Sequence, residues 1–224
     1  MQRIFDLIFA GMAMLVLMPL LLPVMIILKL SGEGEVFFVQ PRMGHSGRKF
    51  GLLKFATMLK NSPHMGTGTL TLKDDPRVLP FGKFLRASKL NELPQIFNIL
   101  KGEMSIIGPR PQTQRCFDAF PDHSQAEIIK VRPGLSGVGS IVFRAENQMM
   151  ADADNADRLY DQVIMPYKGQ LEEWYVANQG IGLYFLLIFL TAWVVVFPRS
   201  RLHWRVLRGL PEVPDALVGY VGSR

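Results

Sequence analysis

Two long apolar runs, one near each end, dominate the pattern of hydrophobic and polar positions along the chain. The first extends from Leu7 to Leu28 and has no charged residue in 22 positions, whereas a helix needs roughly 20 residues to span a bilayer. The second, from Trp174 to Pro198, is also free of charge. Both runs predict helices that face lipid. The first run is longer than that of a signal peptide, so we expect it to be retained.

The first run is interrupted by Pro19 and Pro23, which cannot donate an amide hydrogen and which clash with the carbonyl one turn earlier. They predict a kink or a break, so that two half-helices would enter and leave the membrane on one side. An ordinary spanning helix that tolerates both prolines is the alternative.

Arginines after the second run favour the re-entrant alternative, because arginine favours the cytoplasmic side of a membrane. The residues concerned are Arg199, Arg201, Arg205 and Arg208. The region after the first run is also basic, so both runs point to one membrane face. We therefore expect re-entrant or interfacial helices. Two true crossings, with both ends outside, are the competing topology.

Between the two runs, the pattern predicts a small sheet and several helices. Glu35–Arg42 and Arg48–Met58 are rich in Val, Phe and Leu and are separated by a Gly/Ser/His turn, so we expect a hairpin. Residues 59–69 lack periodicity and predict a loop. Helices are expected at residues 79–87, 90–101, 112–130 and 151–178. The predicted fold class is α+β, mostly helical with a small β-hairpin or sheet. Its anchors are an N-terminal proline-broken re-entrant membrane helix and a C-terminal interfacial helix.

Composition supports a membrane-associated chain with an anionic partner. Hydrophobic residues make up 49% of 224, which is high for a soluble domain. The single cysteine, Cys116, excludes an internal disulfide and suits a reducing compartment. Residues 41–140 hold 15 Lys/Arg against 7 Asp/Glu, and residues 141–180 hold 3 against 7. Nucleic acid, acidic lipid and phosphorylated substrates all fit the basic region, but without an aromatic-basic signature we expect no nucleic acid.

The segment Asn91-Glu92-Leu93-Pro94 has both a structural and a chemical interpretation. Asn can cap a helix, Glu suits its positive end, and Pro fits its first turn, so a plain capped helix explains these residues. The chemical interpretation is that the carboxylate of Glu92, beside Arg86 and Lys89, lies where a phosphate and its metal ion would gather.

Two proline and glycine turns supply further candidate phosphate ligands. In Ile106–Pro111, a glycine and Pro109 precede Arg110 and a second proline follows it, so the backbone is rigid and the guanidinium can make two parallel hydrogen bonds to phosphate. Arg132–Ser140 adds an arginine and three glycines. Lys54 is expected to reach a phosphate from a strand. Rigid turns with solvated arginines, and a snorkelling surface lysine, are the alternatives. Walker, GxSxG and zinc motifs are absent from the sequence.

Taken together, these motifs make the chain resemble the monotopic phosphoglycosyl transferases, bacterial enzymes that start the assembly of surface glycans. The resemblance covers roughly residues 1–195. Its motifs are the proline-broken apolar helix, KF-x-TM at Lys54–Met58, DPR at Asp75–Arg77, FGKFLR at Phe81–Arg86, ELPQIFNILKGEMS at Glu92–Ser105, GPRP at Gly108–Pro111 and RPG at Arg132–Gly134. This ordered series is far more specific than any one part.

The resemblance implies a re-entrant helix in one leaflet, an Mg²⁺-dependent site, and transfer of a sugar-1-phosphate from a UDP-sugar to undecaprenyl phosphate with release of UMP. It also implies the cytoplasmic face of the bacterial inner membrane. In the family an Asp-Glu pair opens the ELPQ helix, and the Asp attacks phosphorus to form a covalent intermediate. A carboxylate nucleophile divides one displacement between two anions into two steps.

This sequence departs from the family pattern at the nucleophile, because position 91 is Asn and a carboxamide is a very poor nucleophile. Three accounts stay open: Glu92 takes over attack or metal binding, the lipid phosphate attacks directly while Asn91 orients groups, or the protein is inactive. Ala56, where relatives often carry a basic residue, and Val138-Gly139-Ser140, where many have an aromatic, are further departures.

Our prediction is a phosphoglycosyl transferase in which Glu92 is a metal ligand or acid/base group and Asn91 occupies the nucleophile position. The expected phosphate ligands are Lys54, Arg86, Pro109, Arg110 and Arg132. Expected parts are a membrane helix at 1–30, a catalytic domain at 31–178, an apolar helix at 179–198 and a basic tail at 199–224. The rivals are a non-catalytic binder of nucleotide-sugar or lipid phosphate and an ordinary two-span protein. A homo-oligomer is compatible with the sequence, which names neither the sugar nor the glycan.

Overall fold

The computed structural model describes residues 1–62, 65, 75–144, 146, 149–150 and 155–222. The chain forms two compact units. Unit 1 comprises Met1–Asp6, Arg42–Phe50 and Gly102–Arg224, whereas unit 2 comprises Leu7–Pro41 and Gly51–Lys101. The predicted α+β fold, mostly helical with little sheet, is confirmed.

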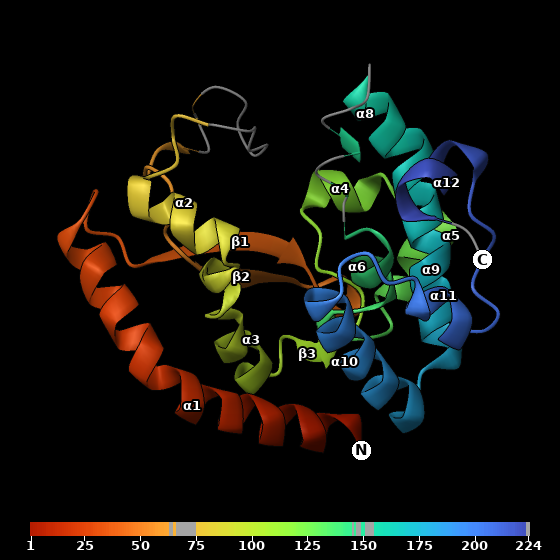
Figure 1. Ribbon diagram of the computed structural model, residues 1–224, viewed down its shortest axis with the longest axis horizontal. Coiled ribbons are helices and arrows are strands. Elements are labelled where there is room, and N and C mark those ends of the chain that lie inside the picture. Colours follow the sequence, from red (N-terminus) through yellow and green to blue (C-terminus); the bar gives the residue numbers. More distant parts are fainter. Residues whose placement is uncertain (63–64, 66–74, 145, 147–148, 151–154, 223–224) are drawn as a thin grey trace. The chain divides into compact units, whose positions relative to one another are not determined.

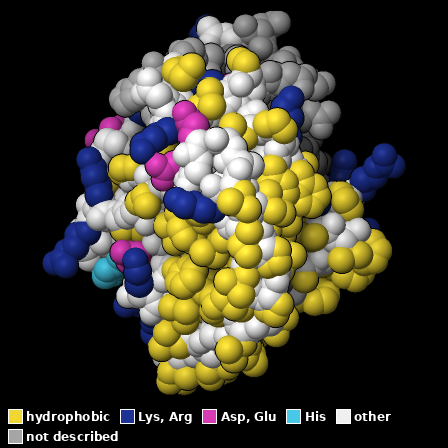
Figure 2. Space-filling view, turned by 90° about the vertical axis from the view of Figure 1, so that its left-hand side faces the viewer, with side chains coloured by type: hydrophobic (Ala, Val, Ile, Leu, Met, Phe, Trp, Pro, Cys, Tyr) yellow, Lys and Arg dark blue, Asp and Glu magenta, His cyan; other side chains and the backbone are white. Residues whose placement is uncertain are grey.

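Helix α1 (Gln2–Leu30) contains the first apolar run. Of the two predicted outcomes at Pro19 and Pro23, a kink or a break, the structure has a kink: the helix is continuous, and its axis changes direction partway along (Figure 1). A bend separates the proline ring from the carbonyl one turn earlier while most other backbone hydrogen bonds persist. Within the described residues, α1 is the one helix long and apolar enough to cross a membrane. Figure 2, which faces α1, shows hydrophobic side chains spread over this surface.

The predicted hairpin is confirmed as strands β1 (Phe37–Met43) and β2 (Lys49–Phe55). Leu52 and Phe55 point into the core of unit 2, where Phe55 stacks on Phe37 with ring centroids 5.7 Å apart. Most of the loop predicted at residues 59–69 lies outside the described residues.

The helix predicted at residues 90–101 is wrong in its first turns. Helix α2 (Pro80–Ala87) is followed by a single 3₁₀ turn, η3 (Leu90–Glu92), and helix α3 (Gln95–Lys101) begins only after Pro94. Pro94 has no amide hydrogen to donate into a continuing helix. Asn91 therefore lies inside the 3₁₀ turn and does not cap an α-helix.

Unit 1 contains a parallel strand pair that the sequence pattern did not predict. Strand β3 (Ser105–Ile107) pairs with β4 (Gly134–Ser136), with Ser105 opposite Gly134. Each strand has three residues, too few for a recognisable alternation. The segment interpreted as a glycine-rich turn is therefore partly a strand, which leads into helix α6 (Val138–Val142).

The remaining helices of unit 1 are shorter than predicted. The helix expected at residues 112–130 is two helices, because Pro121 begins the second and restricts the residue before it. Within residues 151–178, of which 151–154 lie outside the described residues, a π-helical turn separates two α-helices. The bounds are α4 Gln114–Asp118, α5 Asp122–Ile128, α8 Ala156–Leu159, η4 Tyr160–Ile164 and α9 Met165–Asn178.

The second apolar run forms helix α10 (Ile181–Val196). The segment predicted as a basic tail folds back into α11 (Leu202–Val206) and α12 (Asp215–Val221). Trp204 anchors it, because its side chain is buried and its Nε1 donates to the carbonyl of Val221 at 3.1 Å. The predicted domain boundaries stay predictions.

Candidate functional site

The predicted site residues fall into two groups, one in each unit. Unit 2 carries Lys54, Arg86, Asn91 and Glu92, and unit 1 carries the turn Pro109-Arg110 and Arg132. Each group is held in place by contacts within its own unit, and these contacts differ in kind.

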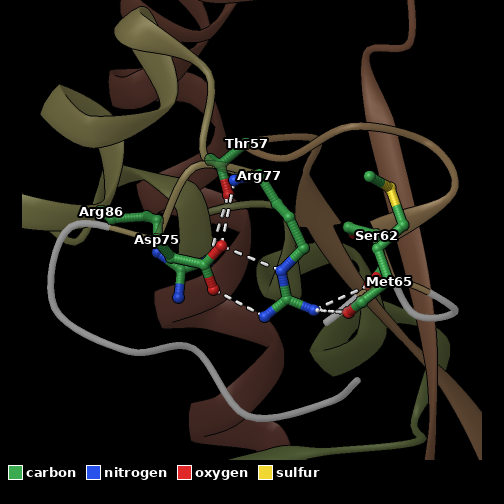
Figure 3. Close-up of polar contacts among 6 residues, drawn as sticks. All are labelled: Thr57, Ser62, Met65, Asp75, Arg77 and Arg86. Atoms are coloured by element: carbon green, nitrogen blue, oxygen red, sulfur yellow. Dashed lines mark hydrogen bonds and ion pairs between the residues drawn. The ribbon is translucent and has the colours of Figure 1, made fainter. Parts of the chain in front are cut away.

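In unit 2, a buried ion pair fixes the segment that precedes α2 (Figure 3). The Arg77 guanidinium donates to both carboxylate oxygens of Asp75, from Nε at 2.9 Å and from Nη2 at 2.6 Å. Its Nη1 donates to the carbonyl oxygens of Ser62 and Met65 at 2.8 and 2.7 Å. Both charged side chains are nearly inaccessible, so Arg77 serves as an internal brace rather than as a substrate ligand.

Helix α2 lies directly on the Thr57 backbone and so positions Arg86. A Cβ added at Gly82 would lie 2.2 Å from the carbonyl oxygen of Thr57, so only glycine permits this approach. One turn later, Arg86 Nη1 donates to Thr57 Oγ1 at 3.4 Å (Figure 3). The FGKFLR motif therefore places one arginine of the candidate site.

The charges around Arg86 form the electrostatic centre of this group. Burial lowers the pKa of Arg86, and the negative charges of Asp75 and Glu92 act in the opposite direction, while Arg77 adds to the lowering. Arg86 therefore lies within electrostatic reach of the half-buried Glu92. An arginine opposite a carboxylate can hold a phosphate and a cation side by side.

The 3₁₀ turn that carries Asn91 and Glu92 begins from a strained residue. Lys89 has φ +60°, the left-handed region that non-glycine residues rarely adopt. From there the amide of Glu92 donates to the Lys89 carbonyl at 3.1 Å. The side chain of Asn91 is buried, and Gln95 Nε2 is buried without a hydrogen-bond partner among the described residues. Sequence reasoning missed the strain at Lys89, and the roles predicted for Asn91 and Glu92 stay predictions.

Lys54 lies on β2, half-buried, and its Nζ donates to Gln40 Oε1 on β1 at 3.1 Å. The side chain is therefore tied to the hairpin. Its predicted contact with phosphate stays a prediction.

Among the described residues of unit 2, a single carboxylate, that of Glu92, is placed to bind an Mg²⁺ ion beside Arg86. No cluster of three or more His, Cys, Asp or Glu side chains exists among the described residues. Both carboxylate oxygens of Asp75 accept hydrogen bonds from Arg77, which leaves Glu92 as the carboxylate beside Arg86. This set suits Mg²⁺ because the ion usually takes one or two protein carboxylates and completes its shell with water and substrate phosphates.

In unit 1, the Arg110 turn (Gly108–Pro111) is fixed by backbone atoms in direct contact. A Cβ added at Gly134 would lie 2.1 Å from the Gly108 nitrogen, and one at Gly137 would lie 2.2 Å from the Gly108 carbonyl oxygen. The Gly134 amide donates to the Pro109 carbonyl at 2.8 Å. The GPRP and RPG motifs therefore belong to one rigid assembly.

That assembly presents two arginines at its surface. Arg110 and Arg132 are both exposed, and Arg132 Nε donates to the carbonyl of Gly102 at 2.9 Å. On the other side of the turn, the amide of Met43 donates to the Gln112 carbonyl at 2.8 Å. The Arg132 side chain is thus held by Gly102, and the predicted contacts of both arginines with phosphate stay predictions.

Asp6 is the residue of unit 1 that sequence reasoning missed. Its carboxylate is buried, and Oδ1 accepts hydrogen bonds from Ser105 Oγ at 2.9 Å, the Ile106 amide at 3.0 Å and Tyr184 OH at 3.0 Å. Asp6 thereby joins the first turns of α1 to β3, directly before the Arg110 turn. A signal was present, because Asp6 is the only acidic residue before Glu33.

Known proteins with similar sequences identify the family to which these motifs belong. Residues 1–198 match the family described as bacterial sugar transferase. The exopolysaccharide production protein ExoY of Sinorhizobium fredii is 38% identical over 157 residues, or 64% of this chain and 69% of that protein. The undecaprenyl-phosphate glucose phosphotransferase of Komagataeibacter xylinus is 32% identical over 204 residues, or 89% of this chain and 36% of that protein.

A third relative is the UDP-glucose:undecaprenyl-phosphate glucose-1-phosphate transferase of Xanthomonas campestris pv. campestris. It is 41% identical over 145 residues, or 63% of this chain and 30% of that protein. The chain thus spans 69% of the shorter relative but only 30% and 36% of the two longer ones. Since the family match covers 198 of 224 residues, the predicted enzyme class is confirmed, and the chain belongs to the bacterial sugar transferase family.

Proposed function

We propose that this chain transfers a sugar-1-phosphate from a UDP-sugar to undecaprenyl phosphate, or to a related polyprenyl phosphate, and releases UMP. The reaction would initiate the assembly of a bacterial polysaccharide or other glycan. The observation that carries the proposal is the half-buried carboxylate of Glu92 within the field of Arg86, in a chain whose relatives are named for this transfer.

In the proposed reaction, an oxygen of the lipid phosphate forms a bond to the sugar-proximal phosphorus of the UDP-sugar. The bond from that phosphorus to the bridging oxygen breaks, and UMP leaves with the electron pair. The sugar is then joined to the lipid through a diphosphate. Direct attack suits this chain because Asn91, at the family's nucleophile position, offers a neutral carboxamide.

The protein's own contribution is to hold charge, because phosphoryl transfer depends mainly on positioning and on electrostatic stabilisation. In unit 2 we assign phosphate binding to Arg86, with Lys54 as a further ligand, and in unit 1 Arg110 and Arg132 stay predicted phosphate ligands. Glu92 is the side chain we assign to Mg²⁺, which when bound would neutralise charge on the diphosphate. Asn91 would orient groups through its amide.

For the location, we propose the cytoplasmic face of the bacterial inner membrane, with α1 entering and leaving one leaflet. The bend in α1, a helix that contains Pro19 and Pro23, supports a re-entrant path. The arginines after α10 favour the cytoplasmic side.

The test is UMP release by the purified chain with undecaprenyl phosphate, Mg²⁺ and a panel of UDP-sugars. We expect release only when the lipid acceptor is present, and Glu92→Gln should slow it by at least about 100-fold. Glu127→Gln, which removes a half-buried carboxylate in α5 that pairs with Lys130, is the control and should leave the rate unchanged. Full turnover by Glu92→Gln would remove Glu92 from the mechanism.

The buried Asn91 favours one alternative, a membrane-bound protein that binds nucleotide-sugar or lipid phosphate without turnover. Asn91→Asp separates the two functions. A silent native chain that gains activity with Asp would identify Asn91 as an inactivating residue. If neither the native chain nor Asn91→Asp releases UMP but both still bind UDP-sugar, the result would support the non-catalytic binding protein.

A further inference from the structure

Helix α10 is attached to unit 1 along one face. Its 16 residues are fewer than the roughly 20 that a spanning helix requires. Tyr184, Leu187 and Leu190 are buried, with exposed fractions of at most 1%. Thr191 Oγ1 lies 2.8 Å from Ser136 Oγ on β4, within hydrogen-bond distance. The helix therefore lies on the protein surface rather than across a bilayer.

The opposite face of α10 is apolar and exposed. Phe185, Phe189 and Val196 are spaced by four and seven residues, so they lie along one side of the helix. Phe189 is 51% and Val196 66% exposed. A contiguous apolar patch of this kind on an exposed protein surface indicates a docking site.

Four exposed arginines follow this face immediately, and we call them the arginine cluster: Arg199, Arg201, Arg205 and Arg208. The chain turns sharply at the end of α10, where Trp193 Nε1 donates to Ser200 Oγ at 2.8 Å. Among the described residues, no carboxylate forms an ion pair with any of the four. Residues 199–222 carry two acidic residues against these four cations.

The arginine cluster stands on an ordered base. In α11, His203 and Trp204 are buried while Arg205 is exposed, so the packed side of the helix faces inward and the cation outward. Arg201 directly precedes α11 and is exposed as well. The family match ends at residue 198, so the cluster belongs to the part of the chain beyond that match.

We propose that the exposed face of α10 and the arginine cluster form a docking surface for anionic phospholipids. The apolar face would contact acyl chains, and the guanidinium groups would bind headgroup phosphates, which arginine contacts through paired hydrogen bonds. Charge selects this occupant over a second copy of the chain. A symmetric dimer on this face would bring the cluster of one copy toward that of the other.

The test uses the full chain reconstituted in mixed vesicles of phosphatidylcholine and phosphatidylglycerol, with tryptophan fluorescence as the readout. Bromine is placed on the acyl chains of either phosphatidylglycerol or phosphatidylcholine, at equal bromine content. The fluorescence quenching measured for the native chain, minus that measured for Trp193→Phe, gives the quenching of Trp193 alone. Trp193 lies near the end of α10. An arginine near an anionic surface gains roughly fivefold in binding, so we expect quenching to indicate at least about fivefold local enrichment of phosphatidylglycerol.

Two variants assign the effect to the cluster. Replacing all four arginines by Gln should equalise quenching by the two lipids, whereas replacing them by Lys should preserve most of the excess because the charge is kept. Arg48→Gln with Lys130→Gln, which removes exposed cations elsewhere in unit 1, is the control and should change nothing. Salt at 1 M should abolish the excess, since the screening length then falls to about 3 Å.

Equal quenching by both lipids in the native chain would overturn the proposal. An undiminished excess in the Gln variant would overturn the role of the cluster, and no quenching of Trp193 by either lipid would overturn the docking of α10. These outcomes do not depend on catalysis, because UMP release is measured separately.

Discussion

The Asn91 turn (Leu90–Glu92) and the Arg110 turn (Gly108–Pro111) both carry candidate site residues, but different contacts hold them in place. In unit 2, the buried Asp75–Arg77 ion pair braces the segment before α2 and acts together with one close backbone approach, that of Gly82 to Thr57. In unit 1, backbone atoms meet directly, and Gly134 leaves no room for a side chain. Both members of an ion pair can be replaced together by uncharged residues. At a close backbone contact, by contrast, there is no space even for one added methyl group.

The largest expected effect is that of Gly134→Ala in unit 1. The new Cβ would lie 2.1 Å from the Gly108 nitrogen and 2.5 Å from the Ser136 oxygen, and neither backbone atom can move without separating β3 from β4. We expect the free energy of unfolding to fall by at least about 3 kcal/mol. Denaturant titration of the purified chain measures it.

Gly180→Ala is the matched control, because a Cβ there meets nothing within 4 Å and its φ of −177° is ordinary extended backbone. It should change stability by less than about 0.5 kcal/mol. Equal stability of the two variants would refute backbone contact as the support of the Arg110 turn.

The second effect is in unit 2, where Asp75→Asn would leave the Arg77 guanidinium buried without its charge partner. We expect a clear fall in melting temperature, which Arg77→Met in the same chain should partly reverse because the uncompensated charge is then gone. Glu35→Gln breaks the exposed Glu35–Lys60 pair and should leave the melting temperature unchanged. If the melting temperature of the double variant is no higher than that of Asp75→Asn, uncharged residues cannot replace the ion pair.

The third prediction concerns Glu172, a buried carboxyl group within unit 1. Burial raises the pKa of Glu172 to about 7, against the lowering influence of Lys168 and of the Gly139 amide. The folded chain then binds more protons than the unfolded chain between pH 4.5 and 7. Stability should therefore fall as pH rises through this window and level off above it, by about 1–3 kcal/mol in total.

Glu172→Gln should remove that slope, as measured by denaturant midpoints from pH 4.5 to 8. Glu173→Gln, at the neighbouring position with a less buried side chain, is the control and should retain the slope. A native chain whose stability rises from pH 5 to 7 would contradict the predicted protonation.

The smallest effect is expected from Lys89→Gly at the start of the Asn91 turn. Glycine adopts φ +60° without strain, and this gain exceeds the entropy it loses on folding, so stability should rise by about 0.5–1 kcal/mol. Lys83→Gly, within α2, has no such strain to relieve and should lower stability. A loss of stability in Lys89→Gly would show that the Lys89 side chain stabilises the fold by more than its backbone strain costs.

Features set by neighbouring residues were predictable from the sequence. The apolar helix, the hairpin and the second apolar helix each follow from a local pattern, and the arginine of the GPRP turn was found from its flanking prolines. The β3–β4 pair was not, because it joins Ser105 to Gly134 through three-residue strands and glycine contacts. Periodicity carries no information about such a distant approach.

The roles predicted for the site residues stay predictions, and the contacts that support these residues were not predicted. Glu92 and Arg86 were singled out, and the structure brings them within electrostatic reach. The capping role of Asn91 was wrong, since Pro94 delays the helix. The brace from Arg77 was missed, because its oxygen partners are main-chain carbonyls that any residue supplies.

The most direct test of the proposed transfer follows a ³²P label placed on the sugar-proximal phosphate of the UDP-sugar. With undecaprenyl phosphate and Mg²⁺ present, the account predicts that the label moves into the lipid fraction as a sugar diphosphate, together with an equal amount of unlabelled UMP. A label that stays on UDP while the sugar reaches the lipid would contradict the account, because the chain would then transfer the sugar alone.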